Sequence, residues 1–223
     1  MTRRIAQLLP VVLLLALTVP LSAQPGSNDE LREKAEQGDV QAQYNLGIMY
    51  ETGRGGPQDD AEAVRWYRLA AEQGDAGAQI NLGLMYASGR GVPQDDVAAE
   101  RWFRLAADQG LAQAQNNLGL MYEGGRGVPQ DEAEAVRWYR LAAEQGDAEA
   151  QFNLGAMHAN GRGVPQDDVT AHMWFNLAES HATGVHQNQA IQYRDIMADR
   201  LNADQLAEAQ RLAREWNEAH PRD

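Results

Sequence analysis

Apolar residues recur at helical spacing in a pattern 36 residues long, which occurs four times in succession through the middle of the chain. In the first copy Ala42, Leu46 and Tyr50 share one face, which predicts a helix over residues 40–52. A second amphipathic stretch predicts another helix over residues 60–73. Two helices joined by a short connector form an antiparallel hairpin. A fixed period of this length is typical of hairpins stacked in a solenoid.

The connectors carry signals for where each helix ends and the next begins. Gly53 follows the first helix, at a place where a left-handed backbone conformation favours glycine. Asp59 is the predicted N-cap of the second helix, and Glu62 is expected to complete a capping box with it. Asp131 and Glu134 repeat this pair in the third copy, so the same box is expected there.

Small and large residues recur at fixed positions inside the hairpins. Gly47 lies within a helix, where glycine costs about 1 kcal/mol relative to alanine, so its recurrence predicts a close approach by the partner helix. Trp66 is expected to fill the space between successive hairpins. The copies of these two residues are Gly83, Gly119 and Gly155, and Trp102, Trp138 and Trp174.

The segments on either side of the repeats also have helical patterns and are expected to cap the array. Residues 28–37 predict a leading helix, residues 186–201 a trailing one, and Asn202 with Gln205 the capping-box start of a last helix. The predicted segments are a signal peptide at 1–23, an N-terminal capping helix at 24–39, repeats at 40–75, 76–111, 112–147 and 148–183, and a pair of C-terminal capping helices at 184–223.

The first residues have the layout of a secretory signal peptide. Arg3 and Arg4 precede an apolar run over residues 11–19, and Leu21-Ser22-Ala23 ends in a small residue for cleavage after Ala23, although leucine is less usual than alanine at its first position. A membrane anchor would need about 20 apolar residues, which is longer than this run, and a twin-arginine export signal is the other alternative. The mature protein is therefore expected to be periplasmic or secreted and not embedded in the membrane.

Composition narrows the class of partner. The formal net charge is −13, and loss of Arg3 and Arg4 with the signal makes it more negative. Nucleic acids and anionic lipid surfaces select basic proteins, so neither is an expected partner. The chain has no cysteine, which excludes disulfides and lipid attachment at an N-terminal cysteine. The fold must therefore be held by packing alone.

The repeated unit resembles the Sel1-like repeat family. Its first copy contains Ala42-Gln43-Tyr44-Asn45-Leu46-Gly47 before the turn and Trp66-Tyr67 after it, and the similarity covers residues 40–183. The resemblance implies an all-α, right-handed α/α solenoid related to tetratricopeptide repeats, whose members act as adaptors and scaffolds. A cysteine-rich branch is linked to penicillin binding and β-lactamase activity, and this chain lacks the cysteines of that branch.

Differences among the four copies indicate a binding surface. Five positions of the first helix vary between repeats and lie on one helical face, which lines the concave groove in the solenoids that this chain resembles. Several of these residues are apolar, as in grooves that bind a peptide or helix. The alternative is that some of them pack between successive first helices. The predicted groove residues are Gln41, Tyr44, Ile48, Glu51, Thr52, Ile80, Leu84, Ser88, Gln113, Asn116, Leu120, Glu123, Glu149, Phe152 and Asn160.

Polar residues that stay the same in every copy are expected to be structural, with hydrogen bonds to backbone between adjacent repeats. They are Asn45, Asn81, Asn117 and Asn153 in the first helices, and Arg54, Arg90, Arg126 and Arg162 in the turns.

Chemical motifs are weak in comparison. The turn Gly53-Arg54-Gly55 is not followed by the Lys-Ser/Thr of a phosphate loop, and His181 with His186 has no cysteine partner for a metal. Lys34 is the only lysine, and no serine lies three residues before it as a β-lactamase motif needs. No catalytic residue, cofactor or metal is therefore predicted.

The sequence as a whole predicts a non-enzymatic exported scaffold that binds a protein or peptide segment in its groove. The partner is expected in the cell envelope or outside the cell, and the chain is expected to be a monomer. The alternatives are β-lactamase-like hydrolysis and peptidoglycan binding, both by family association.

Overall fold

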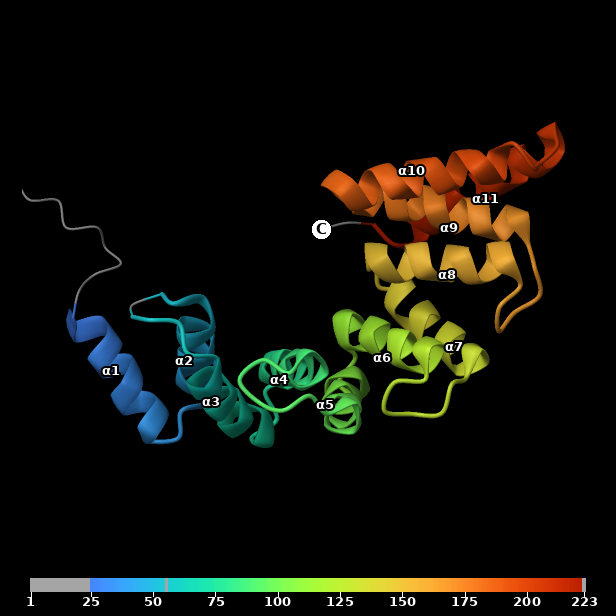
Figure 1. The fold of residues 1–223 in the computed structure, drawn as a ribbon. Coiled ribbons are helices and arrows are strands. Elements are labelled where there is room, and N and C mark those ends of the chain that lie inside the picture. Colours follow the sequence, from blue (N-terminus) through green and yellow to red (C-terminus); the bar gives the residue numbers. More distant parts are fainter. Residues whose placement is uncertain (1–24, 55, 222–223) are drawn as a thin grey trace, which may run out of the picture.

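The computed structural model describes residues 25–54 and 56–221, and this part is made of α-helices without strands. Eleven helices follow one another in a curved array (Figure 1). They are α1 (Pro25–Glu36), α2 (Val40–Thr52), α3 (Asp60–Glu72), α4 (Ala76–Ser88), α5 (Asp96–Asp108), α6 (Ala112–Gly124), α7 (Glu132–Ala143), α8 (Ala148–Asn160), α9 (Asp168–His181), α10 (Gly184–Ala198) and α11 (Ala203–Ala219).

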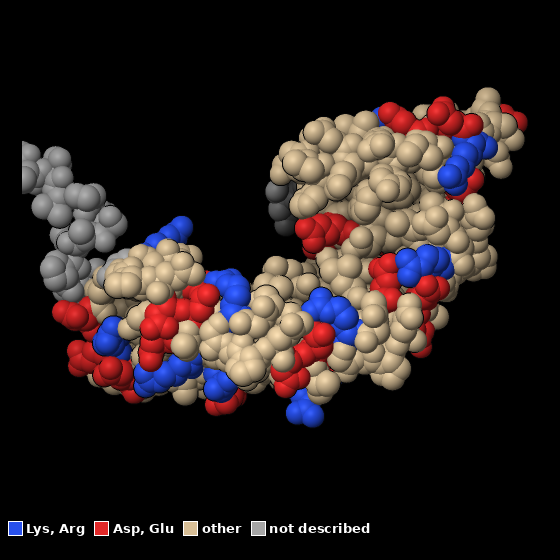
Figure 2. Space-filling view, viewed as in Figure 1, with Lys and Arg blue, Asp and Glu red and all other residues tan. Residues whose placement is uncertain are grey.

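Four hairpins build the array, and the predicted helical solenoid is confirmed. The first helices α2, α4, α6 and α8 each pack along the second helix that follows, which is α3, α5, α7 or α9. Each second helix also packs on the first helix of the next hairpin. Figure 1 shows the array bent around a hollow, with α4 and α6 nearer to it than α5 and α7. Figure 2 shows the same hollow in the molecular surface.

Helix ends follow the signals in the sequence, with one correction. Gly53 ends α2 with a φ of 68°, the left-handed conformation expected there. Asp59 caps α3 by accepting hydrogen bonds from the backbone N–H groups of residues 61 and 62. The predicted capping boxes at Asp59 and Asp131 are not formed, because the glutamates pair along the helix instead: Glu62 with Arg65, and likewise Glu134 with Arg137. The box of Asn202 and Gln205 is present.

The glycines inside the first helices make room for aromatic rings. A Cβ atom added to Gly47 would lie 2.4 Å from the ring of Tyr67 in the paired helix, a distance that real contacts do not reach. A Cβ atom at Gly83 would lie 2.7 Å from Phe103. Close packing therefore offsets the helix-propensity cost of glycine, as predicted, and an aromatic side chain makes the approach.

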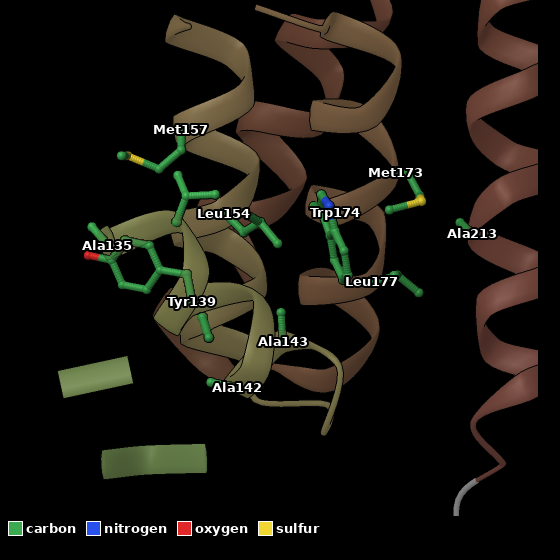
Figure 3. Close-up of a cluster of buried hydrophobic side chains, with 12 residues drawn as sticks. Ala135, Tyr139, Ala142, Ala143, Leu154, Met157, Met173, Trp174, Leu177 and Ala213 are labelled. Carbon is green, nitrogen blue, oxygen red and sulfur yellow. The ribbon is translucent and has the colours of Figure 1, made fainter. Parts of the chain in front are cut away.

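The tryptophans join each hairpin to the one before it. Trp66 packs with Ala35 of α1, and Trp102 packs against the cluster that α3 and α4 form between the first two hairpins. Figure 3 shows the next-to-last junction, where Tyr139, Leu154, Trp174 and their neighbours pack together between α7, α8 and α9. The core is thus a series of linked clusters, which is why each repeat depends on its neighbours for burial.

Glutamines that recur from repeat to repeat form a series of hydrogen bonds inside this core. The buried Gln43 donates from Nε2 to the Ala35 carbonyl at 3.0 Å, and its Oε1 accepts from Gln73 at 2.7 Å. Gln79 and Gln115 make the same two bonds one and two repeats later. These buried amides are satisfied by carbonyls and by one another, so they fix the register between helices.

The repeated arginines link adjacent repeats as expected, but mostly through carboxylates. Arg90 donates to Asp60 of the preceding repeat at 2.9 Å, and Arg126 donates to Asp96 at 2.7 Å. Arg126 also donates to a backbone carbonyl, that of residue 87. The expectation of backbone bonds was wrong for two of the asparagines. Asn45 accepts from Gln41 in its own helix, and Asn153 donates to Asn116 of the preceding repeat.

Helices α1, α10 and α11 cover the two ends of the array. Arg32 of α1 donates to the Tyr50 hydroxyl at 2.6 Å, as Arg68 does to Tyr86, so α1 occupies the place of a second helix. Helices α10 and α11 both pack on α9, and Ala213 of α11 lies in the same cluster as Tyr139 and Trp174 (Figure 3). The predicted signal peptide at residues 1–23 lies outside the described residues.

Candidate functional site

The first helices together form one continuous surface, which we call the first-helix face. Most of the predicted groove residues lie there, exposed or half-buried, and two are in the interior. The exposed residues are Gln41, Thr52, Leu84, Ser88, Gln113, Leu120, Glu149 and Asn160; the half-buried ones are Tyr44, Ile48, Glu51, Glu123 and Phe152; the buried ones are Ile80 and Asn116.

Ile80 and Asn116 are not available to a partner. Ile80 is only 4% exposed and belongs to the cluster that contains Phe103 and Trp138. Asn116 is 3% exposed, accepts a hydrogen bond from Asn153 at 3.0 Å and donates to Glu149 at 3.4 Å. Ile80 and Asn116 occupy the same position of the repeat, where one first helix meets the next. Ile80 contributes apolar packing there, and Asn116 contributes hydrogen bonds.

Glu51 and Glu123 have structural partners that account for their positions. The buried Tyr67 hydroxyl donates to Glu51 at 2.6 Å, and Arg90 of the next repeat donates to the same carboxylate at 2.9 Å. Glu123 accepts from Tyr139 at 2.5 Å in the same arrangement. Burial and the neighbouring carboxylate together raise the pKa of Tyr67 far above its usual value. Both glutamates therefore belong to the links between repeats.

Three polar residues at the ends of the first helices are turned back on their own helix. Thr52 donates to the Ile48 carbonyl, Ser88 to the Leu84 carbonyl and Asn160 to the Ala156 carbonyl, at 2.7, 2.7 and 2.8 Å. Such bonds, from a side chain to the carbonyl four residues earlier, turn the polar group back onto its own helix.

The two aromatic residues of the face are packed on one side. Tyr44 lies 5.9 Å from the Tyr67 ring between centroids, and its ring borders Gly77 of the next first helix. Phe152 lies 5.3 Å from Phe175 and 5.2 Å edge-on to Tyr193 of α10. The two rings are therefore part of the stack and also border the exposed face.

Leu84 and Leu120 are the large apolar residues that the face exposes most. They occupy the same position in α4 and α6, one repeat apart, and are 40% and 44% exposed. Ile48 and Ala156 hold this position in α2 and α8 and are half-buried. We call these four residues the apolar row.

A pocket of about 250 Å³ lies where the row reaches the C-terminal cap. Leu120 forms one side, and Glu149 with Phe152 of α8 forms another. His186 and Gln189 of α10 complete its rim. These two residues were missed by the sequence analysis, because α10 lies outside the repeats and carries no repeat-like signal to place it beside α8.

A second pocket, of about 410 Å³, lies at the N-terminal end between α1 and the turn after α2. Gly56 lines it, at the repeat position where Val92, Val128 and Val164 pack into the core clusters. The pocket is thus space that a valine fills at the later boundaries, and it is separate from the apolar row.

Two further features were sought in the described ranges. None of their helices is both long and apolar enough to cross a membrane. No three His, Asp or Glu side chains of these residues are grouped as a metal ion would need.

Comparison with known proteins agrees with this geometry. The family model described as "Sel1 repeat" matches residues 40–75, 76–111, 112–147 and 148–181, which together make up more than half of the chain. No curated protein sequence matches significantly.

Solved structures with this fold include a Sel1 repeat protein from Oxalobacter formigenes. It is 34% identical with a TM-score of 0.68, over 88% of this chain and 76% of that one. A protective antigen, c5321, present in uropathogenic Escherichia coli strains is 32% identical with a TM-score of 0.57, over 87% of this chain but only 49% of its own. A Klebsiella pneumoniae protein described as a sel1 repeat protein is 20% identical with a TM-score of 0.52 and shares the fold.

Proposed function

The chain belongs to the Sel1 repeat family, and on this basis we propose that it is an exported scaffold that binds a protein segment along its first-helix face. The observation that carries the proposal is the apolar row. Leu84 and Leu120 lie one repeat apart with about two fifths of their surface in solvent. An apolar strip bordered by polar residues is the kind of surface that receives a peptide or an amphipathic helix.

Export is supported by the sequence of residues 1–23, with its basic start, apolar run and Leu21-Ser22-Ala23. An exported chain without cysteine must be stable in an oxidising compartment without disulfides. The linked core clusters provide that stability by packing. N-terminal sequencing of protein recovered from the periplasm or medium should begin at Gln24. Recovery of the full-length chain in the cytoplasm would contradict export.

The binding proposal is tested with two leucine pairs of matched exposure. Leu84→Ser/Leu120→Ser removes the centre of the apolar row. Leu69→Ser/Leu105→Ser removes leucines of the second helices that are 37% and 47% exposed. Truncating an anchor residue at an interface costs roughly 2 kcal/mol or more of binding free energy. The first variant should therefore bind much less of the partner than wild type, and the second should bind about as much.

The measurement is chemical cross-linking of the mature protein in envelope extract, followed by mass spectrometry. Thermal unfolding of both variants should stay close to wild type, because exposed substitutions change stability by about 0.5 kcal/mol or less. Equal recovery of the same partners by the two variants would show that the first-helix face is not the binding surface.

A further inference from the structure

The carboxylates of the first-helix face differ in their partners. Glu51 and Glu123 are neutralised by arginines of the next repeat, Arg90 and Arg162, at 2.9 and 2.7 Å. Glu149 is exposed and forms no ion pair with any other described residue. Its polar contact is the 3.4 Å hydrogen bond that it accepts from the neutral Asn116. Glu149 therefore carries a negative charge on the face that lies in the first turn of α8 and that no described arginine or lysine pairs with.

This charge occurs in one repeat only. The same position is occupied by Gln41, Gly77 and Gln113 in the first three repeats, none of which carries a charge. The charge also lies at the pocket beside Leu120, which Glu149 and Phe152 line together. An apolar recess and a negative rim thus occur side by side at one end of the apolar row.

The size of the pocket indicates what enters it. Sites for whole small ligands have volumes of roughly 300–1,000 Å³, and this pocket of about 250 Å³ is smaller. One aliphatic or aromatic side chain is a better match. The Phe152 wall is held in place by Phe175 and by Tyr193 of α10, with centroid distances of 5.3 and 5.2 Å. The recess is therefore preformed, which lowers the entropy cost of binding.

We propose that this pocket selects partner segments in which an apolar side chain lies next to lysine or arginine. The apolar side chain enters between Leu120 and Phe152, and the cation meets the Glu149 carboxylate at the rim. This selection rests on the proposed binding along the first-helix face. It specifies which end of the face recognises the partner and which chemical groups do so.

The ion pair contributes to specificity more than to affinity. Exposed pairs are worth roughly 0.2–1 kcal/mol, which corresponds to a preference of up to about fivefold. A glutamate in the partner at the same place would be repelled by Glu149 and by the net charge of −13. The pocket thus favours basic over acidic segments on a surface whose other contacts are apolar.

Selection from a displayed library of random dodecapeptides, with the mature protein as bait at pH 8, provides the test. Glu149 is the carboxylate that lines the pocket, so the preference should depend on it. Wild-type protein should enrich peptides with a large apolar residue next to lysine or arginine. Glu149→Gln should lose the basic preference and keep the apolar one.

A matched control moves the charge without changing its amount. The variant Gln113→Glu/Glu149→Gln keeps the net charge and places the carboxylate one repeat away from the pocket. It should not recover the preference. Synthetic versions of the enriched peptides, measured by fluorescence anisotropy, should lose about two- to fivefold in affinity when the basic residue becomes glutamine, and this loss should disappear in Glu149→Gln.

The outcomes separate this selection from the broader function. Peptides that depend on Leu84 and Leu120 but carry no basic residue would overturn the selection and leave the scaffold function intact. A basic preference that survives Glu149→Gln would overturn it as well. Failure to enrich any peptide that depends on Leu84 and Leu120 would overturn both.

Discussion

Repeats one and three differ from repeats two and four in a pair of residues that lies between their first and second helices. In repeat one the buried Tyr67 donates to Glu51, which also accepts from Arg90 of the next repeat, and Tyr139 with Glu123 does the same in repeat three. In repeats two and four the corresponding pairs are Phe103 with Ala87 and Phe175 with Ala159. For repeat two, Arg126 of the next repeat donates to the Ala87 carbonyl instead, at 3.1 Å.

The difference teaches that variation between repeats has two causes. Glutamate occurs wherever the paired helix carries tyrosine, and alanine wherever it carries phenylalanine, because a buried hydroxyl needs an acceptor and a ring without one does not. Position 51 and its copies therefore vary together with the core. Leu84 and Leu120 have no such partner in the core, so variation at their position changes the exposed surface instead.

Glu123→Ala should have the largest effect on stability among the variants that test this difference between repeats. It leaves the buried Tyr139 hydroxyl without its acceptor and removes one carboxylate from Arg162. An unsatisfied buried donor costs roughly 1–3 kcal/mol, and more for charged groups, so we expect urea unfolding to show a loss of about 3 kcal/mol. Adding Tyr139→Phe copies the side chains of repeat two and should restore most of it. A double variant as unstable as the single one would show that the hydroxyl is not responsible.

High pH should weaken repeats one and three selectively. Burial, then the bond to a carboxylate, raises the pKa of Tyr67 and of Tyr139. Above about pH 10 the unfolded tyrosines release protons that the folded ones keep, so stability falls as pH rises past this value. Between pH 9 and 11 the two residues should cost roughly 2–3 kcal/mol.

The control for this pH effect carries Phe at positions 67 and 139 and Ala at positions 51 and 123, so that all repeats resemble repeat two. Its unfolding free energy should change less between pH 9 and 11. An alkaline loss equal to that of wild type would assign the effect to other groups.

Gly119→Ala and Gly155→Ala compare how firmly the two kinds of ring are held. The new Cβ atom would lie 2.4 Å from Tyr139 in repeat three but 3.0 Å from Phe175 in repeat four. Overpacking costs roughly 1–3 kcal/mol, against about 1 kcal/mol regained in helix propensity. Thermal unfolding should therefore show a net loss of about 1–2 kcal/mol for Gly119→Ala and little change for Gly155→Ala. Equal losses would show that the hydrogen-bonded Tyr139 ring moves aside as readily as the Phe175 ring.

His158→Tyr addresses the smallest difference, which concerns the last turn of α8 in repeat four. His158 stands where Tyr122 accepts from Arg104 at 2.7 Å. Burial lowers the pKa of His158; the nearby Asp167 carboxylate opposes this shift and Arg140 adds to it. Below about pH 6.5 the unfolded histidine binds a proton that the folded one does not, so stability is lost as pH falls.

The tyrosine variant should therefore lose up to about 1 kcal/mol less than wild type between pH 7.5 and 5.5 in chemical denaturation. The buried His172, whose pKa is also lowered, remains in both proteins and provides the common background. An unchanged difference between the two pH values would assign the acid sensitivity to His172 or to carboxylates.

Much of the fold could be predicted because its determinants are local. Gly53 and Asp59 mark where α2 ends and α3 begins, and they act through backbone conformation and one or two hydrogen bonds. The need for glycine at Gly47 also follows from the period, since the same cost recurs in each repeat. The candidate surface was less predictable, because helical spacing places Ile80 and Leu84 on one face although only Leu84 is exposed.

The sequence by itself determined the repeat length, the helix pairs and the positions of glycine and tryptophan, because these depend on periodicity and on interactions within one unit or its copies. The tertiary structure alone decided which variable residues remain exposed. Asn116 is buried by contacts from the next repeat, and Phe152 is bordered by Tyr193 of α10. Those contacts join segments far apart in the chain, so they follow from how the helices pack and not from the pattern of any one helix.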